Sequence, residues 1–307
     1  MAAILFIPNR TTRQERSLHS EPSSIFDNFN DTLQNLPGIR LAASPDGSAF
    51  VAAQGAQVLS WQAADGIERL YLSPVTGGIT RDGRKVAPIR GGVPVCFPQF
   101  SERGAMVKHG FARNLPWRLD DHVQASLTMS LHDDDAGRQY WPHAFEAQLD
   151  VCLGSGSLEI VLKVTNTGSE PFSFTTALHT YLRVDDVRRI QLLGLQDVAY
   201  EDATDSCTVK TQRERALPIS GEVDRVYLNA PGSVRMVEQV RTLLTISQRG
   251  FFDTVVWNPG PDRARMLADM PDEDWLHMLC VEAACASAAI MIAPGASWEG
   301  SQRLSVG

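Results

Sequence analysis

The sequence predicts one large all-β domain. From about residue 38, short stretches alternate between apolar and polar residues and end at turn residues, the pattern of half-buried strands. No segment keeps a helical period over three turns, and neither an internal repeat nor a low-complexity linker divides the chain. An all-β fold is therefore expected, and the 43% hydrophobic content is ample for a large core.

The clearest strand pattern lies near the middle of the chain. Leu158, Ile160, Leu162 and Val164 alternate with mostly polar neighbours, and the stretch ends at the turn sequence Asn166-Thr167-Gly168. Residues 50–61, 144–153 and 241–247 show the same alternation. These segments are predicted to be strands with one face buried.

The N-terminus differs in composition from the rest. Residues 1–35 are polar and irregular, rich in Arg, Ser, Asn and Asp, so we expect a loosely attached N-terminal extension. We expect residues 36–307 to form a single domain.

Net charge restricts the classes of partner. The 307 residues carry a formal charge of −8, which argues against nucleic acid, because a phosphate backbone requires a basic face. The chain has no apolar run of about 18 residues, so no membrane span is expected. Positive charge that binds an anionic substrate must then be gathered locally, within one cleft.

The cysteines and histidines indicate neither disulfides nor a metal cofactor. Five cysteines are scattered along the chain, without disulfide spacing or a paired CxxC zinc pattern. The seven histidines also lack zinc-site spacing. We therefore expect reduced cysteines, a cytoplasmic protein and no required cofactor or metal.

Two neighbouring segments concentrate cations among backbone-restricting residues. Residues 89–100 read IRGGVPVCFPQF, and residues 108–113 read KHGFAR. The glycines Gly91 and Gly92 can reach positive φ and allow another group to come close, whereas prolines fix φ. Such loops commonly hold side chains at fixed positions for binding.

Two titratable residues stand out in apolar strand-like runs. In residues 172–184, His179 shares one predicted strand face with Thr175, Ala177, Tyr181 and Arg183. In residues 275–286, Glu282 is the only charged residue after His277, and a bare carboxylate is costly to bury. Each residue also has a purely structural interpretation. His179 could be a strand histidine whose hydrogen bonds are satisfied, and Glu282 could be one partner of a structural salt bridge.

The motifs together resemble a known family. The matching blocks, in chain order, are residues 89–100, 108–113, 178–181 (LHTY), 222–227 (EVDRVY), 256–261 (VWNPGP), 269–272 (DMPD) and 280–282 (CVE). They resemble the hexose-6-phosphate mutarotases, or glucose-6-phosphate 1-epimerases, a branch of the aldose 1-epimerase (galactose mutarotase) family. The resemblance implies a large twisted antiparallel β-sandwich with a sugar site on its concave face, and it favours a monomer.

The resemblance also implies an activity and residue roles. The expected enzyme is an isomerase that interconverts the α and β anomers of hexose 6-phosphates without a cofactor. His179 matches the catalytic acid, and Glu282 matches the general base. Arg90 and Arg113 match substrate-binding arginines, and Asp224 matches the substrate-binding aspartate. His109 is expected to be a further polar wall of the pocket.

This chain departs from the family pattern at two positions. Lys108 stands where relatives often have Gln, and the added positive charge suits a phosphosugar. Ser101 replaces a frequent glycine, so the 101–107 loop is expected to differ in shape.

Two other functions stay open on the sequence alone. One is a free-aldose 1-epimerase, although a neutral sugar gives no reason for three cations in the two loops. The other is a non-catalytic carbohydrate-binding sandwich, which would have no need of a matched acid and base.

Overall fold

The computed structural model describes residues 28–43, 45–75, 77, 88–134 and 137–307. Most of the expected N-terminal extension lies outside these residues. Its last part, however, is not irregular, because β1 (Asp31–Leu33) pairs antiparallel with the next strand. No described helix is long and apolar enough to cross a membrane.

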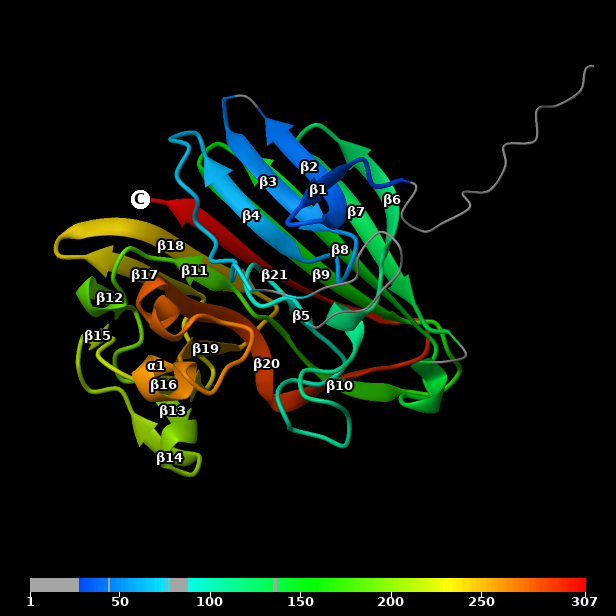
Figure 1. Ribbon diagram of the computed structural model, residues 1–307. Coiled ribbons are helices and arrows are strands. Elements are labelled where there is room, and N and C mark those ends of the chain that lie inside the picture. Colours follow the sequence, from blue (N-terminus) through cyan, green and yellow to red (C-terminus); the bar gives the residue numbers. More distant parts are fainter. Residues whose placement is uncertain (1–27, 44, 76, 78–87, 135–136) are drawn as a thin grey trace, which may run out of the picture.

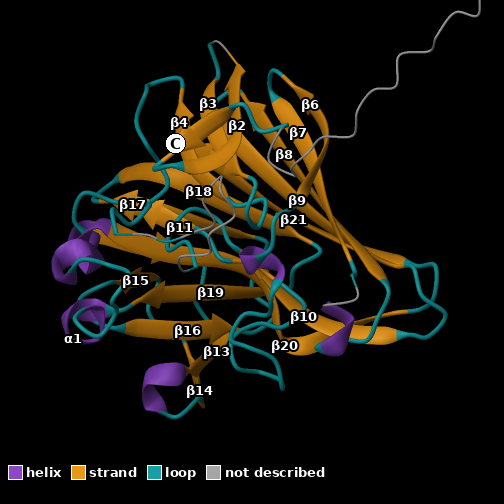
Figure 2. Cartoon of the chain, turned by 45° about the vertical axis from the view of Figure 1, so that its right-hand side comes forward, coloured by secondary structure: helices purple, strands orange, loops and turns teal. Residues whose placement is uncertain are grey.

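The described strands form three antiparallel sheets (Figures 1 and 2). The four-stranded sheet contains, in spatial order, β1, β2 (Leu36–Ala43), β3 (Gly47–Ala52) and β4 (Val58–Ala63). The nine-stranded sheet contains, in order, β15 (Ala216–Pro218), β12 (Ile190–Leu193), β17 (Ser233–Glu238), β18 (Arg241–Arg249), β21 (Ser297–Val306), β9 (Ser157–Asn166), β8 (Phe145–Gly154), β7 (Ser126–His132) and β6 (Arg118–Val123).

The third sheet has eight strands. Its order is β14 (Thr208–Thr211), β13 (Ala199–Asp202), β16 (Val223–Tyr227), β19 (Asp253–Asn258), β20 (Met278–Ile292), β10 (Phe172–Leu178) and β5 (Val95–Cys96), and β11 (Tyr181–Arg183) also pairs with β20. Helices are short: α1 (Gly260–Ala264) and 3₁₀ helices at Ala112–Asn114, Gly137–Gln139, Val187–Arg189, Ala203–Asp205 and Asp272–His277. The predicted all-β sandwich is therefore confirmed.

One central core joins the three sheets. The alternation predicted for β9 is confirmed, since Leu158, Ile160, Leu162 and Val164 are all buried in it. Apolar side chains of β3, β10 and β20 contribute to the same cluster. Burial of this continuous apolar surface provides the main driving force for folding.

The eight-stranded sheet has apolar side chains on both faces. In β20, Val281 and Cys285 belong to the central core, whereas Ala284 and Ala286 belong to a smaller cluster. Because side chains alternate along a strand, Glu282 points to the same face as that smaller cluster. This face carries the cleft described below.

Two predicted strand segments differ from the structure. Residues 50–61 form the hairpin of β3 and β4 rather than one strand, because Gly55 (φ 70°) and Ala56 (φ 47°) turn the chain. Residues 275–286 begin in a 3₁₀ helix and become extended only at Met278. An apolar run alone did not distinguish these conformations.

The glycine pair allows a close backbone approach. Gly91 has φ 120° and Gly92 has φ 60°. A Cβ atom would lie 2.4 Å from the Tyr71 carbonyl oxygen at Gly91, and 2.1 Å from the Val58 carbonyl oxygen at Gly92. The loop before β5 therefore packs directly on neighbouring backbone, as the sequence predicted.

Gly92→Ala should lower the free energy of unfolding more than Gly66→Ala does. Gly66 has φ 71° and no described atom within 4 Å of a Cβ, so its replacement by Ala carries only the left-handed backbone cost of about 1–2 kcal/mol. Gly92→Ala adds a clash with β4 backbone. Urea unfolding of both variants measures the difference, and equal losses would show that close approach is unimportant.

Candidate functional site

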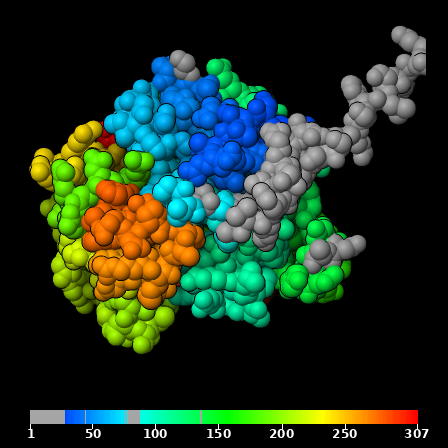
Figure 3. Space-filling model, in the orientation of Figure 1, coloured from blue at the N-terminus to red at the C-terminus, as the bar shows by residue number. Residues whose placement is uncertain are grey.

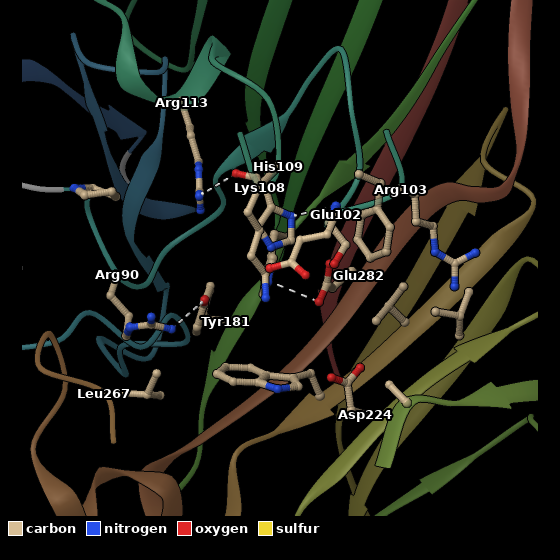
Figure 4. Close-up of a pocket in the computed structure, with 18 of the residues that line it drawn as sticks. Arg90, Glu102, Arg103, Lys108, His109, Arg113, Tyr181, Asp224, Leu267 and Glu282 are labelled. Carbon is tan, nitrogen blue, oxygen red and sulfur yellow. Dashed lines mark hydrogen bonds and ion pairs between the residues drawn. The ribbon is translucent and has the colours of Figure 1, made fainter. Parts of the chain in front are cut away.

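A cleft of about 540 Å³ opens on the eight-stranded sheet. Its lining includes all seven predicted site residues, namely Arg90, Lys108, His109, Arg113, His179, Asp224 and Glu282. Figure 4 shows Lys108, His109 and Glu282 between Arg90 and Arg113 on one side and Arg103 on the other. The volume is within the range of small-molecule sites.

Strand pairing brings His179 and Glu282 together. Leu178 of β10 pairs with Ala283, and Tyr181 of β11 pairs with Cys280. The two residues between β10 and β11 therefore lie opposite Val281 and Glu282 of β20. His179 Nδ1 lies 3.3 Å from Glu282 Oε1, although the two residues are 103 positions apart in the sequence.

The surroundings hold the His179 ring in place. Its backbone N–H donates to the Pro94 carbonyl oxygen at 2.9 Å, which ties it to the loop before β5. The ring stacks on Tyr181, with centroids 4.7 Å apart and planes 8° from parallel. The edges of His109 and Trp257 complete an aromatic enclosure.

Burial disfavours charge on both members of the pair. The exposed fraction is 7% for His179 and 1% for Glu282. The pKa of Glu282 is raised well above its usual value by burial and then by the nearby Asp224 carboxylate. The pKa of His179 is lowered well below its usual value by burial and by His109, Arg113 and Arg90. Burial therefore favours the neutral form of each group in the free protein.

His109 is a neutral hydrogen-bond donor. Burial and the nearby Arg113, Lys108 and Arg90 lower its pKa to about 3. Its Nδ1 atom accepts the Ser101 N–H at 3.3 Å and contacts Cys96 Sγ at 3.1 Å. The proton is thereby assigned to Nε2. His109 can donate to a sugar oxygen, and it is a poor acid at neutral pH.

The loop that joins residues 89–100 to residues 108–113 begins and ends with left-handed backbone positions, which glycine adopts most readily. Ser101, which replaces a frequent family glycine, has φ 50°. His109 has φ 67° and Gly110 has φ 68°. Ser101 and His109 are strained as non-glycine residues in this region, and these turns bring Lys108 and His109 to the cleft.

Arg90 is fixed by contacts from several segments. Gln57 donates from Nε2 to the carbonyl oxygens on both sides of it, at Ile89 (3.3 Å) and Gly91 (2.7 Å). The Arg90 Nε donates to Asp269 Oδ1 at 2.6 Å, and Nη1 donates to Tyr181 Oη at 3.3 Å. Figure 3 shows the orange surface near residue 270 beside the cyan surface near residue 90, which agrees with the Arg90–Asp269 ion pair.

Arg113 and Lys108 are linked through the backbone. Arg113 lies in the 3₁₀ helix Ala112–Asn114, and its Nη2 donates to the Lys108 carbonyl oxygen at 3.0 Å. Its Nε atom is buried and has no hydrogen-bond partner among the described residues. Lys108 itself is exposed at the cleft. The three predicted cations thus lie around one cavity.

The opposite wall pairs its cations with acids. Arg103 donates from Nη1 to the Ala286 carbonyl oxygen at 3.2 Å, and its Nη2 forms an ion pair with Glu201. Arg263 lies 3.6 Å from Glu222. Asp224 of β16 is on the floor near this wall, and burial raises its pKa. Both walls therefore contain arginines whose charge is partly offset by an acid, since Arg90 likewise pairs with Asp269.

Sequence reasoning assigned no role to two contributors to the cleft, Tyr181 and Asp269, although both are in the quoted motifs. For Trp257 it left core packing and a sugar platform equally open. Trp257 lines the cleft and lies 5.9 Å from the Arg90 guanidinium. The two-residue spacing of His179 and Tyr181 on one strand face could have indicated Tyr181. The Arg90–Asp269 pair spans 179 residues, and no local pattern reveals it.

Known proteins match nearly the whole chain. Residues 38–305 match the aldose 1-epimerase family. A relative from Cenchrus ciliaris, named "Putative glucose-6-phosphate 1-epimerase", is 34% identical over 295 residues, covering 92% of this chain and 88% of its own. A protein of the same name from Escherichia coli (strain K12) is 35% identical over 254 residues, covering 79% and 81%.

A solved structure agrees with this match. The crystal structure of a "putative mutarotase" from Salmonella typhimurium superposes with a TM-score of 0.79 at 30% identity, covering 90% of this chain and 92% of that one. The family match and the fold lead to the same assignment. The chain belongs to the aldose 1-epimerase family and is an isomerase.

Proposed function

We propose that this isomerase interconverts the α and β anomers of glucose 6-phosphate and similar hexose 6-phosphates. The observation that carries the proposal is a buried acid–base pair on the floor of a cleft whose wall holds three cations. The names of the relatives from Cenchrus ciliaris and Escherichia coli support the same substrate.

The chemistry requires two proton transfers and no cofactor. Glu282, in its ionised form, removes the proton from the C1 hydroxyl, and protonated His179 gives its proton to the ring oxygen. The bond between C1 and the ring oxygen breaks, and an aldehyde forms. Rotation about the C1–C2 bond and reclosure on the other face give the second anomer, while the two residues exchange roles.

Substrate binding can prepare the pair for this step. In the free protein the arginines disfavour a positive charge on His179. A bound phosphate would offset the charge of Arg90 and Arg113, so that the proton can pass from Glu282 to His179. The resulting carboxylate and imidazolium are the required base and acid. Phosphate recognition and acid–base catalysis are thereby coupled.

Each remaining polar group has a role in binding. We assign the phosphate to Arg90, Lys108 and Arg113, because guanidinium groups suit phosphate oxygens and lysine adds a compact charge. Asp224 would accept hydrogen bonds from sugar hydroxyls. His109 would donate from Nε2 to a sugar oxygen.

A free-aldose epimerase is the second candidate. Such an enzyme would use the same acid–base pair, and it would differ from the proposed one only in that its cations do not bind a substrate phosphate. We also place the protein in the cytoplasm as a monomer; its five free cysteines support a reducing compartment.

Replacing either member of the pair should abolish most activity. Glu282→Gln and His179→Asn should each lower kcat by roughly 10²–10⁴-fold, the scale for one lost acid–base group. Magnetisation-transfer NMR between the two anomers measures the rate directly. The double variant should lose less than the product of the single effects, because the two groups act together.

The chain supplies a matched control for this experiment. His132 and Glu146 form a similar pair, 3.9 Å apart and exposed, outside the cleft. His132→Asn and Glu146→Gln should leave the rate unchanged. Near-normal anomer exchange in either cleft variant would show that the assigned catalytic role is wrong.

The pH profile of kcat/KM should be bell-shaped, with each limb assigned to one residue. Because the pKa of Glu282 is raised and that of His179 is lowered, the acidic limb reports protonation of His179. The alkaline limb reports loss of the proton from Glu282. With unshifted pKa values the assignment would be reversed: the acidic limb would report Glu282 and the alkaline limb His179.

The residual activity of His179→Asn and Glu282→Gln tests this assignment of the limbs. It should be measured on unphosphorylated glucose, because a substrate phosphate titrates near pH 6 and obscures the acidic limb. His179→Asn leaves Glu282 as the base, so its activity should rise with pH as Glu282 loses its proton, with a midpoint well above the usual pKa of Glu. Glu282→Gln leaves His179 as the acid, so its activity should fall with pH as His179 loses its proton, with a midpoint well below the usual pKa of His. Midpoints near the usual values would contradict the shifted pKa values.

Removing one arginine should weaken binding of the phosphosugar selectively. Arg90→Ala or Arg113→Ala should cost about 1.5–3 kcal/mol for glucose 6-phosphate, the scale of a hydrogen bond to a charged group. This corresponds to roughly 10- to 150-fold in Kd. Activity on glucose should change much less, because the lost partner is the phosphate.

Arg103→Ala is the matched control, since Arg103 is an ion-paired arginine on the opposite wall of the same cleft. It should affect both sugars little. Equal losses on glucose and glucose 6-phosphate in the Arg90 and Arg113 variants would mean that these arginines only shape the cavity.

A further inference from the structure

A cysteine lies beside the acid–base pair. Cys280 and Glu282 are two residues apart on β20, so their side chains point to the same face of the strand. Cys280 pairs with Tyr181, the residue that stacks on His179. One ligand atom from each of His179, Cys280 and Glu282 lies within 4.8 Å of the other two.

Two side-chain atoms of this trio have no hydrogen-bond partner among the described residues. His179 Nδ1 and Glu282 Oε2 are buried and accept or donate no hydrogen bond among the described residues. Buried polar atoms are nearly always satisfied, so each unsatisfied one requires an explanation. A catalytic role explains why these atoms are left free to contact a substrate. The same free atoms can also bind a metal ion.

The spacing of the nitrogen and oxygen ligands suits a tetrahedral ion, and the three ligand atoms lie within 4.8 Å of one another. Two nitrogen or oxygen ligands about 2.0–2.1 Å from zinc in tetrahedral geometry are about 3.3 Å apart. The Nδ1–Oε1 distance is 3.3 Å, and the contact does not have hydrogen-bond geometry. Thiolate, imidazole and carboxylate are all zinc ligands, and three protein ligands leave a fourth position for water or a sugar oxygen.

We propose that His179, Cys280 and Glu282 form an inhibitory site for Zn²⁺ or a similar borderline-soft divalent ion. Binding forms bonds from Sγ, Nδ1 and a carboxylate oxygen to the ion, and releases the thiol proton and the proton of the pair to solvent. The ion then occupies both groups that would transfer protons. Mg²⁺ and Ca²⁺ prefer oxygen ligands and should not compete. The inhibition, but not the metal binding, rests on the proposed function.

Metal binding is tested first, independently of activity. Co²⁺ added to metal-free protein should produce a thiolate-to-cobalt charge-transfer band in the near ultraviolet, and Zn²⁺ should abolish it. Cys280→Ser should lose the band. Cys207→Ser should keep it, because this exposed cysteine lines the cleft but lies outside the trio. The absence of a band in the unaltered protein would overturn the proposal, whether or not the variant folds.

Inhibition is tested second. Zn²⁺ should stop anomer exchange of glucose 6-phosphate, and a chelator should restore it. In Cys280→Ser the half-inhibitory Zn²⁺ concentration should rise by more than the roughly 10- to 100-fold typical of losing an outer-shell partner. Unchanged inhibition in this variant would place the metal elsewhere and overturn the proposal. A cobalt band without any epimerase activity would support the site and refute the proposed function.

Discussion

The contact between His179 and Glu282 is the constraint on which the site depends. Both groups are taken out of water by the pairing of β10 and β11 with β20, and burial opposes charge on each of them. Such burial is unfavourable in isolation, and the continuous apolar core on the other face of the sheet offsets it. The fold therefore holds the two groups against each other in an environment that disfavours charge on both.

The cations act on this pair as well as on the substrate. The chain is acidic overall, with a net charge of −8, yet Arg90, Lys108 and Arg113 gather around one cavity. Burial lowers the pKa of both His179 and His109; Arg113 and Arg90 lower both further, and Lys108 adds to the effect at His109. An anion bound among them would reverse that effect at His179. A neutral sugar would leave it in place, so the same residues that bind a phosphate would also decide when the acid forms.

The sequence predicted the fold class and the residues that line the cleft, but not their electrostatics. Alternation in β9 was readable because one face of that strand is buried. Glu282 stood out as a lone charge in an apolar run. The lowered pKa of His179 was beyond reach, because it depends on complete burial and on His109, Arg113 and Arg90 from other segments. The Arg90–Asp269 pair and the Gln57 contacts that fix Arg90 are likewise set by tertiary structure.

The most direct test compares glucose 6-phosphate with glucose in the unaltered protein. Magnetisation-transfer NMR of both sugars gives kcat/KM for each anomer exchange at one pH and ionic strength. If the cations read a phosphate, glucose 6-phosphate should be preferred by at least about 10-fold, the effect of a single charged hydrogen bond. Equal values, or a preference for glucose, would contradict the account and favour a free-aldose epimerase.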